Sequence, residues 1–208
     1  MPLSLSLAAI YQPYVDPKHF FLDPLTAAKF TSPENCCSSY LGAISNFGVL
    51  MWAFAAAICS FSAYLIYSFK LAAKYFFFLL NSGIISFVLM LDDMFMAHEQ
   101  IYPQLLGLKE EYLVLIYGLS ILGYIIYSYR VILELDFLLL ITSLIFFFLS
   151  VAIDIGYSGS AALLKPFGED INKLLGISFW TAFCIRSCWL ICFLQVNQPG
   201  QEKIHNQG

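Results

Sequence analysis

The sequence predicts an all-α fold, a polytopic transmembrane helical bundle with about five spanning helices. Two observations on composition lead to this fold class. Hydrophobic residues make up 60% of the 208 residues and charged residues only 12%, and the mean hydropathy is +0.77. A soluble domain carries about 25% charged residues, so the charged side chains here are too few to cover a water-exposed surface. The third observation is that the apolar residues form long runs without charge.

Five apolar runs, four of them without any charge, account for the predicted helices. A helix that crosses a bilayer needs about 17 to 25 residues. The runs are continuously apolar rather than alternating, which disfavours the strands of a β-barrel. Because lipid offers no partner to unpaired backbone groups, continuous runs of this length predict helices. The predicted spans are residues 45–69, 75–91, 112–129, 137–153 and 171–196.

The spans lie within a predicted transmembrane domain of residues 41–196, with one segment on each side of it. Residues 1–40 mix aromatic side chains with five Pro, a composition that fits either an interfacial lid or a loose tail. No Lys or Arg precedes the first apolar stretch, so a secretory signal peptide is not expected. Residues 197–208 are polar, and we expect a disordered tail there.

The charges outside the spans bear on orientation and on partners. Lys70 and Lys74 adjoin helix ends in a short loop without acids, which favours an outside N-terminus and a cytoplasmic C-terminus. The net charge is −4 with only two Arg, so the chain has no basic patch and nucleic-acid binding is not expected. The lipid bilayer is the expected partner.

Acidic residues gather at one face of the predicted bundle. A helix rises about 1.5 Å per residue, so Asp92 and Asp154 each lie about 27 Å from the charged residue that precedes their span, at the far side of the hydrocarbon. The fifth span starts at that same face. The ionisable residues placed there are Asp92, Asp93, His98, Glu99, Asp154, Glu169 and Asp170.

Helical spacing divides the residues near the end of the second span. Asp92 and Glu99 are seven positions apart and share a stripe, whereas Asp93 is turned about 100° away. We therefore expect Asp92 and Glu99 to point together. Asp93 is expected to pair elsewhere or to face a neighbouring helix.

Carboxylates brought together repel one another, so one of them must take up a proton or find a cation. Asp, Glu and a single His suit Mg, Mn, Ca or non-haem iron, which makes a divalent metal ion the candidate cofactor. Such an ion would activate water for hydrolysis or hold a phosphate-containing headgroup. The predicted metal ligands are Asp92, His98, Glu99, Asp154, Glu169 and Asp170.

Two other interpretations of these acids stay open. In one, they form a proton site with raised pKa values, as in membrane proton relays. In the other, they are hydrated groups in the headgroup region, and Glu169 and Asp170 face the positive end of the fifth helix dipole.

Arg186 lies inside the fifth span, about 22 Å from its start. An Arg at this depth costs about 2.5 to 3.5 kcal/mol on insertion scales, so it should have a partner. By depth, the candidates are Glu134 and Asp136, near the start of the fourth span. We expect a structural ion pair between Arg186 and Asp136 rather than a functional role.

Three segments, residues 45–59, 91–99 and 171–186, resemble an uncharacterised family of bacterial, including cyanobacterial, polytopic integral membrane proteins. The likeness lies in an Asp-Asp…His-Glu element after the second span and an acid-rich start of the last span. It covers most of residues 41–196. It implies a bacterial inner membrane or thylakoid location, but no assigned activity.

Two classes of function therefore stay open. The first is a metal-binding membrane protein or membrane enzyme that uses the acidic and His cluster. The second is a non-catalytic accessory or assembly subunit of a larger membrane complex. A transporter is less expected, because the chain shows neither repeats nor broken spans.

Overall fold

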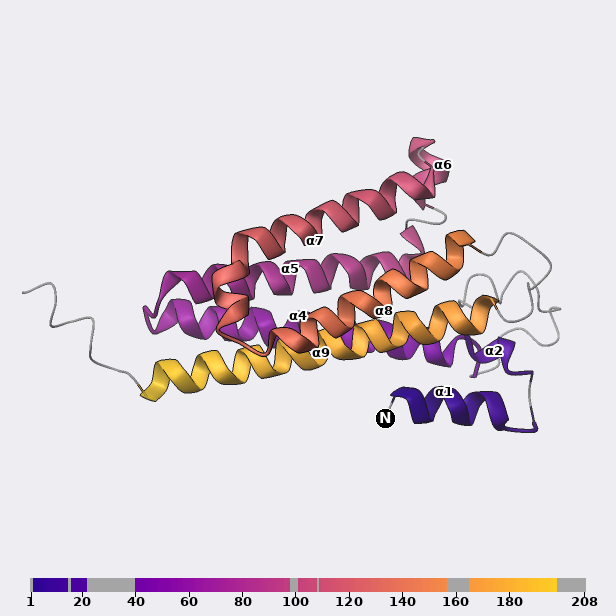
Figure 1. Cartoon of the computed structure of the whole chain (residues 1–208), viewed down its shortest axis with the longest axis horizontal. Helices are drawn as coiled ribbons and strands as arrows, with labels where there is room; N and C mark the ends of the chain where they lie inside the picture. The colour runs from indigo at the N-terminus through magenta and orange to yellow at the C-terminus, as the bar shows by residue number, and fades with distance from the viewer. Residues whose placement is uncertain are drawn as a thin grey trace, which may run out of the picture.

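The structure, a computed structural model, contains long helices that run alongside one another, with shorter helices at one end (Figure 1). It describes residues 2–14, 16–21, 40–97, 101–107, 109–156 and 165–197, and within these ranges it contains no strand. The helices are α1 (Pro2–Tyr11), α2 (Lys18–Phe21), α4 (Ala43–Ser68), α5 (Ala73–Phe95), α6 (Tyr102–Leu106), α7 (Glu110–Leu133), α8 (Phe137–Gly156) and α9 (Lys165–Asn197).

Five of the described helices are long and apolar enough to cross a membrane, which confirms the predicted all-α bundle with five spanning helices. The membrane-capable segments are Ala43–Ser68, Ala73–Phe95, Tyr112–Leu133, Phe137–Asp154 and Gly168–Leu194. The main difference from the sequence prediction is at the fifth helix, since α9 begins at Lys165 rather than at residue 171. Hydropathy detects only the apolar part of a helix, and the first turns of α9 are polar and charged.

Helices α4, α5 and α9 build most of the core. Gly83 of α5 lies against α4, where a Cβ atom would be 2.7 Å from Ser60 Oγ and 3.3 Å from the Ser60 backbone nitrogen. The side chain of Trp180 in α9 is buried, and its Nε1 donates a hydrogen bond of 2.9 Å to Ser86 Oγ of α5. Cys188 Sγ of α9 lies 3.9 Å from Cys59 Sγ of α4. Small side chains thus let these three helices approach closely.

Helices α7 and α8 lie outside this core, and they bury the smallest share of their residues among the five spans. Helix α8 packs along α9, where a Cβ atom on Gly176 would lie 2.8 Å from the Phe147 ring and Ser143 Oγ donates to the Gly176 carbonyl at 2.8 Å. Helix α7 is joined to α5 by a 2.7 Å hydrogen bond between the Tyr124 and Ser82 hydroxyls. Their outward faces are apolar, as lipid contact requires.

Helix α1 runs alongside the bundle and packs on α9, and the short α2 packs on α4 and α9 (Figure 1). Their contact is a small apolar cluster of Ala9, Phe21, Ile44 and Leu174. The backbone N–H of Gly42, which precedes α4 in the left-handed conformation at φ 67°, donates to the His19 carbonyl at 2.9 Å. Much of the predicted N-terminal segment, residues 22–39, and the predicted disordered tail beyond residue 197 lie outside the described residues.

Candidate functional site

A polar cavity of about 70 Å³ lies beneath α2, at the end of the bundle where α5 ends and α9 begins. We call this the acidic end, because three carboxylate side chains and one Lys contribute to the lining. The cavity has room for several water molecules or a small hydrated ion. Its described lining residues are Phe21, Ile44, Ser45, Gly48, Asp93, Glu169, Asp170, Lys173, Leu174 and Ile177.

The Asp93 carboxylate at this cavity is largely enclosed and has two partners from other helices. Lys173 Nζ of α9 lies 2.8 Å from its Oδ1, and Trp52 Nε1 of α4 donates a 2.9 Å hydrogen bond to its Oδ2. The Asp93 side chain is 12% exposed and that of Lys173 is 38% exposed. A carboxylate removed from water needs such charge-assisted partners. Asp93 therefore joins α4, α5 and α9 at one point.

Trp52 connects this point to the interior. Its indole is buried and stacks on Phe147 of α8, with ring centroids 5.9 Å apart and an interplanar angle of 6°. It also lies 6.1 Å from the Trp180 ring in α9. The side of the cavity next to α4 is thus backed by packed aromatic rings, and Asp93 is bonded directly to that layer.

Glu169 and Asp170 reach the cavity from α9. The sequence placed them just before the fifth helix, where the helix dipole alone would explain them. Because α9 begins at Lys165, both acids lie beyond its first turn, and the dipole effect falls off within that turn. Lys173 follows them at spacings of three and four residues, which places all three on one face of α9.

Asp92 points to a different helix from its neighbour Asp93. It is buried, and its Oδ1 accepts a 2.8 Å hydrogen bond from the Tyr117 hydroxyl of α7. The turn of about 100° between successive helical residues separates the two carboxylates. The sequence placed Asp92 in the metal set and Asp93 outside it; the structure instead brings Asp93 to the cavity with Glu169 and Asp170.

The other predicted ligands are not brought to this cavity within the described part of the chain. Asp92 and half-buried Asp154 are absent from its described lining residues. His98 and Glu99 lie outside the described residues. Among the residues that the structure does describe, no three His, Cys, Asp or Glu side chains are grouped as a metal ion would require.

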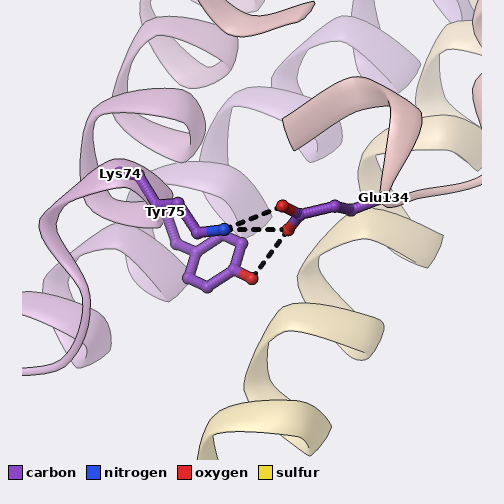
Figure 2. Close-up of polar contacts among 3 residues, drawn as sticks. All are labelled: Lys74, Tyr75 and Glu134. Carbon is purple, nitrogen blue, oxygen red and sulfur yellow. Dashed lines mark hydrogen bonds and ion pairs between the residues drawn. The ribbon is translucent and has the colours of Figure 1, made fainter. Parts of the chain in front are cut away.

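The opposite end of the bundle carries charges of another kind. Lys74 Nζ lies 2.8 Å from Glu134 Oε1 and 3.0 Å from Oε2, and the Tyr75 hydroxyl donates to Oε2 at 2.9 Å (Figure 2). The hydrogen bond from the Lys74 ammonium holds the pKa of Glu134 below its usual value. Both ends of this ion pair are about half exposed. We call this the paired end.

Arg186 also belongs to the paired end. Its Nε lies 2.6 Å from Asp136 Oδ2, so the two residues that the sequence paired are in contact. Both side chains are partly exposed on the surface of the bundle. Glu134 and Asp136 lie on either side of Leu135 at the corner between α7 and α8. This corner is therefore held to α5 on one side and to α9 on the other.

A family model described as a domain of unknown function, DUF8692, matches residues 2–187. The chain belongs to the DUF8692 family. No curated protein and no solved structure matches it. The match includes every described residue of the acidic end and both ion pairs of the paired end, so both are features of the DUF8692 region of the chain.

Sequence reasoning missed several residues of the acidic end in this DUF8692 chain. Lys173 could have been found, because it follows Glu169 and Asp170 on the same face of the fifth helix. Trp52 and Tyr117 could not, since nothing in spacing along one chain tells which helices are neighbours. Asp93 was left out because the phase of α5 alone does not say which of its faces meets α9.

Proposed function

We propose that this integral membrane protein binds a cation at the acidic end, with a divalent metal ion as the first candidate. The observation that carries the proposal is that Asp93, Glu169 and Asp170 all line one small cavity. With Lys173 as the cation of the lining, the four side chains have a formal charge of −2. A cavity with this charge attracts a positive ligand.

The donor chemistry supports a hard cation. Carboxylate oxygens are the ligands that Mg²⁺, Ca²⁺ and Mn²⁺ prefer. Asp92, His98, Glu99 and Asp154, which the sequence analysis also named as metal ligands, remain additional candidate ligands in this proposal. A bound metal ion would polarise water for hydrolysis or hold a phosphate-containing headgroup.

In the proposed binding, an incoming cation competes with the Lys173 ammonium for the Asp93 carboxylate. The ammonium occupies one oxygen of Asp93 at 2.8 Å, so an incoming cation must displace it or share the carboxylate. Replacing an ammonium by another cation keeps Asp93 neutralised, whereas removing the ammonium alone would leave a charge in a mostly enclosed position. Occupancy should therefore alter the environment of Trp52, which donates to the other oxygen of the same carboxylate.

The test uses the purified protein in lipid nanodiscs. Metal content is measured on the protein as purified, and Mn²⁺ binding is followed by electron paramagnetic resonance and by Trp fluorescence. We expect Asp93→Asn and Glu169→Gln to weaken Mn²⁺ binding at least tenfold. Glu134→Gln is the matched control, since it removes a carboxylate at the paired end, and it should leave binding unchanged.

A second titration distinguishes a metal ion from an organic ammonium ion as the ligand. Choline and ethanolamine are titrated in place of the metal, because an organic ammonium has the same charge sign. Binding of ethanolamine without Mn²⁺ would keep the cation site and overturn the metal ion as its ligand. Equal Mn²⁺ affinity in Asp93→Asn and Glu134→Gln would overturn the acidic end as the site.

A second candidate function is that of a non-catalytic accessory or assembly subunit of a larger membrane complex. The partly exposed pair of Arg186 and Asp136 favours it, because Arg186 lies within the membrane-capable segment of α9. A partner helix would shield such a pair from lipid. Purification from native membranes in mild detergent tests this, and a protein that always migrates alone, with or without Arg186→Leu, would count against it.

A further inference from the structure

A second hollow lies on the side of the bundle, between α5 and α7. It has a volume of about 310 Å³, and it lies within the membrane-capable segments of both helices. We call it the α5–α7 groove. Its described lining residues are Asn81, Ile84, Ile85, Ser120, Gly123, Tyr124 and Tyr127.

Asn81 is the unusual residue of this groove. It is eight residues from the start of α5, about 12 Å along the helix, which is too deep for a short side chain to reach the headgroups. The structure records no hydrogen bond for its amide within the described part of the chain. By contrast, Ser120 Oγ donates to the Ile116 carbonyl at 2.8 Å and Tyr124 shares a bond with Ser82. An amide without a partner in hydrocarbon costs several kcal/mol.

The side of the groove that belongs to α7 allows close approach. A Cβ atom added to Gly123 would meet nothing within 4 Å, and Ser120, three residues earlier, is also small and exposed. Small residues let another helix come near enough for interhelical hydrogen bonds. A lipid chain could fill the space, but it cannot bond to the amide.

We propose that a second copy of this chain docks on the α5–α7 groove and that Asn81 pairs with Asn81 of that copy. An amide carries both a donor and an acceptor, so it is its own complement. Two copies related by a two-fold axis along the membrane normal place Asn81 at the same depth in each. In such an isologous contact, each amide donates a hydrogen bond to the other amide and accepts one from it.

The first test measures association in lipid vesicles by single-molecule photobleaching over a range of protein-to-lipid ratios. Wild type should form dimers, and Asn81→Leu should raise the dissociation constant about three- to tenfold. Thr142→Val is the matched control. It also removes a partly exposed polar group from a span, but Thr142 already donates to the Leu138 carbonyl of its own helix at 2.8 Å, so dimerisation should not change.

The second test keeps Asn81 and does not depend on how Asn81→Leu folds. In a background with Cys36, Cys37 and Cys192 replaced by Ser, a Cys is introduced at Ile84 of the groove or at Ile145 of α8. Both positions are about half exposed. A short thiol cross-linker should join copies through Ile84→Cys and not through Ile145→Cys.

Three results would overturn the proposal. One is a wild-type protein that stays monomeric at every ratio, and another is equal cross-linking at the two positions. The third is a monomer that cross-links through Ile84→Cys only to a different protein in native membranes.

Discussion

The two ends of the bundle carry similar charges in different surroundings. At the paired end, Glu134 and Asp136 bind Lys74 and Arg186 with side chains that are 38–55% exposed. At the acidic end, Asp93 binds Lys173 with a side chain that is only 12% exposed. Enclosure, rather than the presence of ion pairs, therefore distinguishes the acidic end as the candidate site. The half-exposed pair of Lys74 and Glu134 contributes little to stability.

The two ends differ in exposure because additional helices pack over the acidic end. Helix α1 packs on α9, the short α2 packs on α4 and α9, and Phe21 of α2 contributes to the cavity lining. At the paired end, Glu134 and Asp136 lie at the corner between α7 and α8, and the side chains of both ion pairs are 38–55% exposed. The acidic end therefore has an enclosed cavity, whereas the ion pairs of the paired end lie at the surface.

The largest expected effect is that of Asp93→Asn, which removes the enclosed charge. It should lower the free energy of unfolding by about 2 to 3 kcal/mol, since the 2.8 Å ion pair with Lys173 in a largely enclosed position would be lost. Unfolding is followed by Trp fluorescence in mixed detergent micelles. Glu134→Gln, the counterpart at the paired end, should cost less than about 1 kcal/mol, since both side chains of its ion pair with Lys74 are about half exposed. Equal losses would remove the distinction between the two ends.

A second effect concerns the packing of α8 on α9, two turns from the acids. Gly176→Ala would place a Cβ atom 2.8 Å from the Phe147 ring, which stacks on Trp52. Displacement of that ring should cost about 1 to 2 kcal/mol and shift Trp emission. Gly118→Ala is the control on the open face of α7, where nothing lies within 4 Å. It should be neutral or slightly stabilising; destabilisation by both variants would argue against tight packing at Gly176.

A smaller effect is expected for Tyr117→Phe. It removes the hydroxyl that donates to Asp92 at 2.8 Å and should cost about 1 kcal/mol in the same unfolding assay. Because Asp92 points to α7, cation binding at the acidic end should be unchanged. A tenfold loss of Mn²⁺ affinity in this variant would show that Asp92 and Asp93 act as one site.

The smallest effect is a pH dependence at the paired end. The Lys74 ammonium lowers the pKa of Glu134 in the folded protein from its ordinary value of 4.5. The stabilisation from this pair is therefore complete above that value and is lost as the pH falls through the lower, folded-state pKa. Since both side chains are about half exposed, the total is below about 1 kcal/mol.

Comparing the unfolding free energies of wild type and Glu134→Gln checks this prediction. The difference between them should be present at about pH 6 and should shrink at about pH 3. A difference that does not change with pH would contradict the role of the Lys74 pair.

The fold was largely predictable from the sequence, because a spanning helix can be recognised from one continuous apolar run. The long apolar runs predicted the five spans, and depth along two helices predicted the contact between Arg186 and Asp136 that the structure shows. The start of α9 was placed late, at residue 171, since its first turns are charged and hydropathy does not register them.

The candidate site was predictable only in part. Depth placed the acids at one end of the bundle, and helical phase separated Asp92 from Asp93. Neither signal says which helices are neighbours, so the partners Trp52, Lys173 and Tyr117 could not be assigned. Side-to-side arrangement depends on packing between segments far apart in the chain, and no spacing rule encodes it.

The adjacent residues Asp92 and Asp93 also fix how α5 is set in the bundle. One carboxylate is held by Tyr117 of α7, and the next is held by Trp52 of α4 and Lys173 of α9. A turn of α5 about its own axis would break contacts to α4, α7 and α9 at once. The two adjacent carboxylates therefore fix the rotational setting of α5 in the bundle.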